Sequence, residues 1–468
     1  MRGTILILFT APYVTAGCLI QTTEMGSQQK TWQNNTNMIG LPVEGTITSV
    51  GAAEAEFTPL QPTSLAGFGS ISRRLFPPVF SPDASIGYCR KYQKIENPPR
   101  IKAAVINLKT KSESTPSKVF FLSLDIVAVT ADLSIKILDK MNESFGSGSA
   151  HLHNSFITAT HTHSAPSGLT ESPLWSSFIC DSFNESMTGN YLNKVQLIFE
   201  QADAAAVPVN EVEISHHIAN RFLKSRNKNM EADTEVSVLS FTNENRESPL
   251  AFLEIAVHPT TFGTQSLILS ADLVTPLEKS FETELGISNV FLMQTHVGNM
   301  ESLRNGYEVN GWAQALAQEF KSKSVSQSTE GLQLKTRAGF ISLPKASINW
   351  KGCAAQAAQY FVSLPLLDQL PAVAPAAQMS LANQTRYFLP GEWTTIAAKK
   401  AIERFSADTV AKVNAKVFSL AFDYTGYHVD KDDYDETGIE SCSSLYGRDS
   451  LERVIETTNK IFKTDELR

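Results

Sequence analysis

The sequence lacks three features that would narrow its function at once. It has no excess of basic residues, since 40 lysines and arginines stand against 48 acidic residues for a net charge of -8. Without a basic patch or stripe, a nucleic-acid partner is not expected. Beyond the N-terminus there is no apolar run of 18 residues, so we expect no membrane-spanning helix. Cysteine is scarce, and none of its five copies has CxxC spacing, which argues against a cysteine zinc site.

What remains is the composition of a globular protein, with 42% hydrophobic and 19% charged residues. A chain of 468 residues can form two or three domains or one large α/β catalytic unit. No internal repeat is visible.

The first 18 residues have the pattern of a secretory signal. Arg2 precedes a short apolar run over 5–14, and Thr15-Ala16-Gly17-Cys18 follows. The small residues before cysteine resemble the end of a bacterial lipoprotein signal, in which Cys18 becomes the lipidated first residue. We therefore expect an exported protein of the cell envelope, anchored to the membrane surface by lipid on Cys18. The alternative is a cleaved signal and a secreted or periplasmic protein.

Residues 19–48 are predicted to be a flexible tether, because 21–37 is rich in Gln, Asn and Thr and has no hydrophobic period. The remaining residues, 49–468, are expected to form one catalytic domain. Setting Cys18 aside, the four other cysteines of an exported chain can form up to two disulfides, in any of three full pairings. These are Cys89, Cys180, Cys353 and Cys442.

The order of predicted elements indicates an α/β domain with mixed β-sheets flanked by helices. Short apolar runs at 103–108 and 119–125 predict buried strands, and helical spacing follows over 127–145. Further helices are predicted over 190–206, 273–285 and 311–322, with strands over 235–257 and 289–294. Residues 360–377 lack a clear period; we expect a long loop, with a lid or an apolar docking surface as alternatives.

The most informative stretch is Ile157-Thr158-Ala159-Thr160-His161-Thr162-His163-Ser164-Ala165-Pro166-Ser167-Gly168. Alternate side chains of a strand share a face, which predicts the rings of His161 and His163 in one cavity, roughly 6–7 Å apart. That spacing suits one metal ligand with a second imidazole beside it for proton transfer. Alternatively, the two histidines are a hydrogen-bonded, semi-buried structural pair.

The segment Thr160 to Gly168 resembles the THTHSGPGG signature of neutral ceramidases, zinc amidases that hydrolyse N-acyl sphingosines. Other landmarks similar to that family follow in the same order and cover about 49–466. They are Val50-Gly51-Ala52-Ala53 with Phe57-Thr58-Pro59, Ala256-Val257-His258-Pro259, Ser270-Ala271-Asp272, Pro390-Gly391-Glu392-Trp393-Thr394-Thr395, Tyr424-Thr425-Gly426-Tyr427 and Ser444-Leu445-Tyr446-Gly447.

The resemblance implies one zinc ion per chain, held by His161, His258, Glu392 and Tyr427. Such a zinc polarises the scissile carbonyl and activates water. Each residue also has a plain structural reading. His258 before a proline resembles a capped surface histidine, Glu392 a carboxylate that stabilises a helix N-terminus, and Tyr427 an aromatic core residue.

Two further catalytic roles follow from the resemblance. His163 is the expected general acid or base, with Asp125 or Asp272 holding its tautomer. Arg221, in Ala219-Asn220-Arg221, matches an arginine that lines the family's active site and could stabilise the developing oxyanion. Its alternative is a surface arginine.

The chain departs from the family pattern at the substrate end. Glu301 stands where the family has a serine, with Ser302 one position late, and Ile439 replaces a family tyrosine. Glu301 could favour a cationic head group over neutral ceramide.

The leading interpretation is a zinc-dependent amidohydrolase of lipid metabolism that cleaves an N-acyl bond of ceramide or a related lipid. The alternatives are a zinc hydrolase acting on a different amide or ester, and a degenerate surface lipoprotein that binds a lipid or glycan.

Overall fold

The structure is a computed structural model that describes residues 5–7, 18–20, 31–68, 73–80, 86–110, 117–179, 182–329, 331–353, 370–405 and 414–463. No helix within these ranges is long and apolar enough to cross a membrane.

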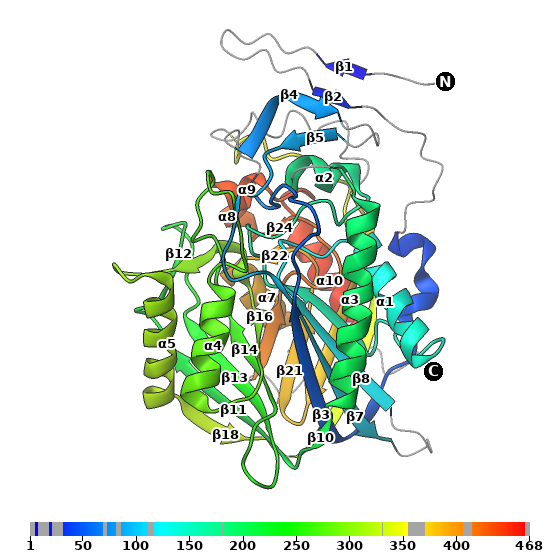
Figure 1. Ribbon diagram of the computed structural model, residues 1–468, viewed down its shortest axis with the longest axis vertical. Coiled ribbons are helices and arrows are strands. Elements are labelled where there is room, and N and C mark those ends of the chain that lie inside the picture. The colour runs from blue at the N-terminus through cyan, green and yellow to red at the C-terminus, as the bar shows by residue number, and fades with distance from the viewer. Residues whose placement is uncertain are drawn as a thin grey trace.

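Two large sheets form the frame of the molecule (Figure 1). In spatial order, the nine-stranded sheet contains β23 (Ala415–Phe418), β21 (Gln384–Phe388), β20 (Val373–Leu381), β19 (Gln333–Ser342), β3 (Glu44–Glu56), β7 (Arg100–Lys109), β8 (Ser117–Leu124) and β9 (Ser155–Ala159), with β10 (Val207–Pro208) paired to β3. The five-stranded sheet contains β16 (Val290–Gln294), β14 (Leu250–Ile255), β13 (Glu235–Thr242), β11 (Glu211–Ile218) and β18 (Val325–Ser328).

Helices lie against these sheets and around one end of them. They are α1 (Ala131–Phe145), α2 (Pro173–Ile179), α3 (Glu185–Ala204), α4 (Val274–Leu285), α5 (Val309–Lys323), α7 (Thr395–Phe405), α8 (Lys431–Tyr434), α9 (Ile439–Cys442) and α10 (Ser450–Lys463), with 3₁₀ turns η1 (Trp32–Asn34), η2 (Thr36–Ile39) and η4 (Val297–Asn299). Figure 1 shows α4 and α5 beside the five-stranded sheet and α1 and α3 beside the nine-stranded sheet.

Five short strand pairs complete the fold. They are β1 (Ile5–Ile7) with β2 (Cys18–Ile20), β4 (Arg74–Phe80) with β5 (Ile86–Cys89), β6 (Lys94–Ile95) with β15 (Ile268–Leu269), β12 (Leu223–Ser225) with β17 (Met300–Ser302), and β22 (Glu392–Trp393) with β24 (Tyr427–His428).

Two adjacent residues of β8 show how the layers pack. The ring of Phe120 contacts Phe145 of α1 and Phe199 of α3, at centroid distances of 5.0 and 5.7 Å. Successive strand residues point to opposite faces, and the ring of Phe121 contacts Phe252 of β14 at 4.7 Å. The nine-stranded sheet therefore packs against helices on one face and against the five-stranded sheet on the other.

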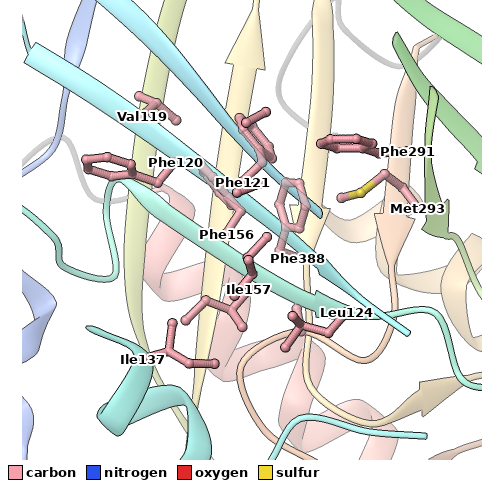
Figure 2. Packing of buried hydrophobic residues seen from close by; sticks show 14 of the residues in the cluster. Val119, Phe120, Phe121, Leu124, Ile137, Phe156, Ile157, Phe291, Met293 and Phe388 are labelled. Atoms are coloured by element: carbon pink, nitrogen blue, oxygen red, sulfur yellow. The ribbon is translucent and has the colours of Figure 1, made fainter. Parts of the chain in front are cut away.

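The space between the sheets is filled by aromatic and sulfur-containing side chains (Figure 2). Phe156 of β9 lies 4.9 Å from Phe121 and 4.4 Å from Phe388 of β21, measured between ring centroids. Phe291 and Met293 reach this cluster from β16. Burial of such large apolar side chains is the main stabilising term of a core, and here it fixes the spacing of the strands that lead to the candidate site.

The predicted fold class, α/β with mixed sheets flanked by helices, is confirmed. Strand β7, strand β8 and helix α1 lie where periodicity predicts them. The hairpin predicted over 235–257 is β13 and β14, which pair antiparallel.

Two predicted segments need correction. The tether over 19–48 is too long, because Trp32 is only 1% exposed and packs on Phe340, and β3 already begins at Glu44. The loop over 360–377 is also wrong in part, since residues from Val373 onward belong to β20. The apolar residues there gave no clear period because Ala374 to Ala377 are all buried, on both faces of the strand. The signal sequence and residues 360–369 lie largely outside the described residues.

One disulfide joins Cys353 to Cys442 at the end of α9. Cys89 is disulfide-bonded as well. Three of the four domain cysteines are therefore disulfide-bonded.

Candidate metal centre and active site

The candidate site lies where strands from both sheets end. His161 and His163 follow β9, His258 follows β14, and Glu392 follows β21 after a short link. Strands β9, β14 and β21 each have a parallel neighbour. Ligand sites in α/β proteins form at the carboxyl ends of such strands, so this topology brings distant sequence segments to one point.

A backbone turn after β9 brings the side chains of His161 and His163 together. The two histidines were expected within one strand, but β9 ends at Ala159 and His161 has the left-handed backbone angle φ of 72°. This angle is rare for residues other than glycine and is found most often where function requires it. The turn brings the rings of His161 and His163 to 4.8 Å, closer than strand geometry predicts.

Two imidazoles converge on a single carboxylate oxygen. His161 Nε2 and His258 Nε2 each lie 3.2 Å from Glu392 Oε2, and all three side chains are at most 2% exposed. His161 Nδ1 is 2.5 Å from the carbonyl oxygen of Val127, and His258 Nδ1 is 2.9 Å from that of Met300. Because a carbonyl only accepts, each Nδ1 carries the proton, so each Nε2 keeps a lone pair that could bind a metal.

A hydrogen bond also fixes the carboxylate of Glu392. Tyr424 Oη donates to Glu392 Oε1 at 2.6 Å, whereas Oε2 accepts no hydrogen bond from any described residue. Burial lowers the pKa of His258 to about 4, so this ring is neutral at pH 7.

His163 stands apart from the other two histidines. Its Nε2 lies 3.3 Å from His161 Nε2, and the three imidazoles could hold a metal ion, since their candidate ligand atoms lie within 4.8 Å of one another. Unlike the other rings, however, its Nδ1 has no hydrogen-bond partner among the described residues. Withdrawal from bulk water lowers the pKa of His163 well below 6.5, which leaves a neutral base beside the metal centre.

Tyr427 reaches the same point from β24, which pairs with β22 so that Glu392 and Tyr427 are opposite each other. Its hydroxyl accepts a hydrogen bond from Arg226 Nη2 at 2.8 Å. Gly391 makes this pairing possible, because a Cβ at that position would lie 2.4 Å from the carbonyl oxygen of Gly426. Burial raises the pKa of Tyr427 well above 10, although Arg226 opposes the shift.

The guanidinium of the site is not the predicted one. Arg221 is 66% exposed and pairs with Glu319 at 3.0 Å, so the prediction that it lines the active site is wrong. Arg226, five residues later, lies in the cavity instead. Its Nε donates to Glu440 at 2.6 Å, and its Nη1 lies 3.1 Å from His258 Nε2.

Arg226 follows β12, which pairs with β17, and its backbone N–H donates to the carbonyl of Asn299. Only the pairing of β12 with β17, two segments distant in the sequence, places Arg226 in the cavity. No local signal in the sequence distinguishes Arg221 from Arg226.

Three other expectations at the site also change. Asp125 and Asp272 do not support His163, since Asp125 binds Lys102 and Thr160 while Asp272 binds Thr261 and Phe262. Glu301 does not line the cavity and pairs with Lys224 at 3.0 Å. A pocket acid that selects a cationic head group is therefore not supported.

The converging groups form the base of a cavity of about 370 Å³. Much of the lining is apolar and includes Ile126, Val127, Leu133, Leu169, Trp175 and Leu445. Ile439, which replaces a family tyrosine, lies in the wall. Concave, mostly apolar sites with a few converging polar groups are typical of small-molecule binding.

Comparison with known proteins agrees with this geometry. Residues 87–331, more than half of the chain, match the model of the neutral/alkaline non-lysosomal ceramidase family, N-terminal region. The neutral ceramidase of Pseudomonas aeruginosa is 23% identical over 197 residues, which are 39% of this chain and 29% of that relative's length. The chain thus aligns with less than a third of this relative.

Two solved structures share the fold. The crystal structure of the Pseudomonas aeruginosa neutral ceramidase superposes with a TM-score of 0.69 at 17% identity, covering 89% of this chain and 74% of that one. A ceramidase complexed with C2 superposes with a TM-score of 0.70 at 16% identity, covering 89% and 75%. With the family match over more than half of its length, the chain belongs to the neutral/alkaline non-lysosomal ceramidase family.

Proposed function

We propose that the protein is a zinc-dependent amidohydrolase that cleaves the N-acyl amide bond of a lipid-like substrate. The observation that carries this proposal is the position of Glu392 Oε2, a buried carboxylate oxygen without a hydrogen-bond donor among the described residues, 3.2 Å from two imidazole nitrogens. Three lone-pair donors facing one point in the dry base of a cavity would repel one another unless a cation lay between them.

The donor set is suited to zinc. Two histidine nitrogens and one carboxylate oxygen, with a further position open, form a recurring hydrolytic zinc site. We assign these donors to His161, His258 and Glu392, with Tyr427 completing the shell. When bound, zinc would polarise the scissile carbonyl and lower the pKa of the attacking water toward about 7.

The chain's own residues supply the proton transfers. His163 takes a proton from the water as it attacks the carbonyl carbon, and then gives a proton to the leaving nitrogen as the C–N bond breaks. The products are a carboxylate and an amine. The neutral state of His163 and its position 3.3 Å from His161 Nε2 support this role.

Arg226 is suited to stabilise the oxygen of the scissile carbonyl, which becomes negative during the attack. Its Nη1 now lies 3.1 Å from His258 Nε2. Once His258 Nε2 serves as a ligand it no longer accepts from Arg226, whose Nη1 is then free to donate to a substrate oxygen. Glu440 and the carbonyl of Gly298 hold the guanidinium in place.

The apolar lining of the cavity supports a substrate with an acyl chain. Ile126, Leu133, Leu169 and Trp175 would cover such a chain and exclude water from the reacting bond. We further propose that the mature protein is held at a membrane surface through lipid on Cys18.

Turnover of N-acyl amides by zinc-loaded protein tests the function, with His163→Ala as the informative variant. We expect His163→Ala to keep its zinc and to lose about a hundredfold or more in kcat, the usual scale for a general acid–base group. Ser302→Ala is the matched control, because Ser302 lies outside the cavity lining, and it should retain most activity. If wild-type protein with one zinc per chain cleaves no N-acyl amide or ester, the proposed function is wrong.

A further inference from the structure

A single buried residue, Leu420, lies between the two arms of the candidate metal centre. Its carbonyl oxygen accepts a hydrogen bond from Ala159 N at 3.3 Å, at the end of β9 that leads to His161. Its own N–H donates to the carbonyl oxygen of Gly391 at 2.8 Å, directly before Glu392. The backbone of Leu420 therefore sets the distance between the two chain segments that carry these side chains.

The backbone at this position has an unfavourable conformation. Leu420 and Phe422 have φ angles of 60° and 63°, in the left-handed region that large apolar residues rarely adopt. Phe422 N also donates to the carbonyl oxygen of Ile157 at 3.0 Å, which ties the segment to β9 a second time. Strained residues of this kind persist only where the surrounding structure holds them, and they are found most often at functional sites.

Asp423 holds this segment by three hydrogen bonds. Its Oδ1 accepts from Ala131 N at 3.0 Å and from Tyr424 N at 2.8 Å. Its main-chain carbonyl oxygen accepts from Gly391 N at 3.1 Å. Asp423 thus connects the strained segment to the first residue of α1 and to the residue that precedes Glu392.

Both side-chain contacts lead to a candidate metal ligand. Tyr424, whose N–H binds the carboxyl group, donates through its Oη to Glu392 Oε1 at 2.6 Å. Ala131 begins α1, and four positions earlier the carbonyl oxygen of Val127 lies 2.5 Å from His161 Nδ1. One carboxyl oxygen therefore lies between the residue that orients Glu392 and the segment that orients His161.

The carboxyl group of Asp423 is not explained by an ion pair. It is 2% exposed, and its Oδ2 has no hydrogen-bond partner among the described residues. Buried Asp125, in contrast, pairs with Lys102 at 3.0 Å. Burial raises the pKa of Asp423 to about 8, and nearby Asp132 adds to the shift, so the group is mostly neutral at pH 7. Burying a carboxyl group costs free energy, which points to a role other than general stability.

We propose that Asp423 is a positioning residue of the candidate metal centre. Its carboxyl group holds the strained segment in the conformation that keeps His161 and Glu392 at the separation a shared metal ion requires. The proposal rests on the assignment of these two residues as zinc ligands in the proposed function. Asp423 is not among the described residues that line the cavity, so its effect on the site is indirect.

Crystal structures of metal-free wild-type protein and of Asp423→Ala test the geometry without zinc. In the wild type, His161 Nε2 lies 3.2 Å from Glu392 Oε2. Alanine leaves two N–H groups without their acceptor. The segment should then relax and change this separation by about 0.5 Å or more, the tolerance of a preorganised site. Asp423→Asn keeps an acceptor oxygen in the same place and should retain the wild-type separation.

Zinc affinity, measured by competition with a chromophoric chelator, is the second readout. Asp423→Ala should bind zinc about ten- to a hundredfold more weakly, the usual effect of removing a group that orients a ligand. Asp423→Asn should bind zinc like wild type. Asn154→Ala is the matched control, because it removes a similarly buried side chain that accepts from His151 N at 2.9 Å, just before the other end of β9. It should keep the wild-type zinc affinity.

Asp423→Ser, whose shorter side chain cannot reach Ala131, should also weaken zinc binding and serves if Asp423→Ala does not fold. An unchanged separation in Asp423→Ala, or wild-type zinc affinity in both folded variants, overturns the proposal. It is also overturned if Asp423→Asn or Asn154→Ala loses as much affinity as Asp423→Ala. If wild-type protein binds no zinc, the proposed function is wrong, and the separation in the metal-free structures still decides the role of Asp423.

Discussion

Glu392→Gln is the most decisive substitution for the metal centre. Glutamine has nearly the same size, and its carbonyl oxygen can still accept from Tyr424 Oη, now 2.6 Å from Glu392 Oε1. Its amide nitrogen would then occupy the position of Oε2, where it donates to the imidazole nitrogens of His161 or His258. The substitution therefore removes one ligand and occupies the lone pairs of the other two, with little change in packing.

The expected shift in melting temperature follows from the coupling of zinc binding to folding. A ligand at a thousand times its dissociation constant stabilises a protein by about 4 kcal/mol. The entropy of unfolding is about 2.1 cal/mol/K per residue, which gives about 1 kcal/mol/K for a chain of 468 residues. Excess zinc should thus raise the melting temperature of wild-type protein by about 4 °C and that of Glu392→Gln by less than about 1 °C.

The assay is thermal unfolding with and without zinc, together with metal analysis of dialysed protein. Glu301→Gln is the matched control, because it removes a carboxylate outside the cavity that pairs with Lys224, and it should respond to zinc like wild type. One zinc per chain retained by Glu392→Gln, with the wild-type shift in melting temperature, would refute the assignment of Glu392 as a ligand.

Two further predictions concern stability and location. Arg386→Met should lower the free energy of unfolding at pH 7 by about 3–5 kcal/mol, because it leaves Glu254 buried without its bidentate partner. Denaturant unfolding measures this change, and a loss under about 0.5 kcal/mol would contradict the prediction. Burial alone raises the pKa of Glu254, but Arg386 and Lys416 lower it overall. The stability that this pair contributes is therefore present above the unfolded-state pKa of about 4.3 and is lost as pH falls through the folded-state pKa. Glu254→Gln should not show this loss of stability at low pH. Cys18→Ser should abolish incorporation of labelled fatty acid and release the protein from membranes, whereas a wild-type protein that incorporates no label in its own host would exclude the anchor.

Much of the frame could be predicted from sequence because the local patterns agree with the final packing. The apolar runs of β7 and β8 are buried on both faces, so they read as continuous hydrophobic strands. Helix α1 has an apolar face and ends where Gly146 follows, with φ of 99°. His258 was correctly placed at the end of a strand, since β14 is short and bounded by Pro249 and Pro259.

The parts that sequence did not predict depend on contacts between distant segments. Glu392 was assigned as a zinc ligand through the family resemblance alone, because its position opposite Tyr427, thirty-five positions later in the chain, depends on the pairing of β22 with β24. The choice between Arg221 and Arg226 depends on the pairing of β12 with β17.

The ion pair of Glu254 with Arg386 explains how two sheets can hold one candidate metal centre. Glu254 lies on β14, four positions before His258, and Arg386 lies on β21, six positions before Glu392. Two parallel hydrogen bonds of 2.7 and 3.1 Å therefore fix the distance between the very strands that deliver these two side chains. Apolar packing alone tolerates sliding of one sheet over the other, whereas a bidentate pair has one geometry. The site residues are thus held in position by the core before any ligand arrives, which is the preorganisation that a hydrolytic centre requires.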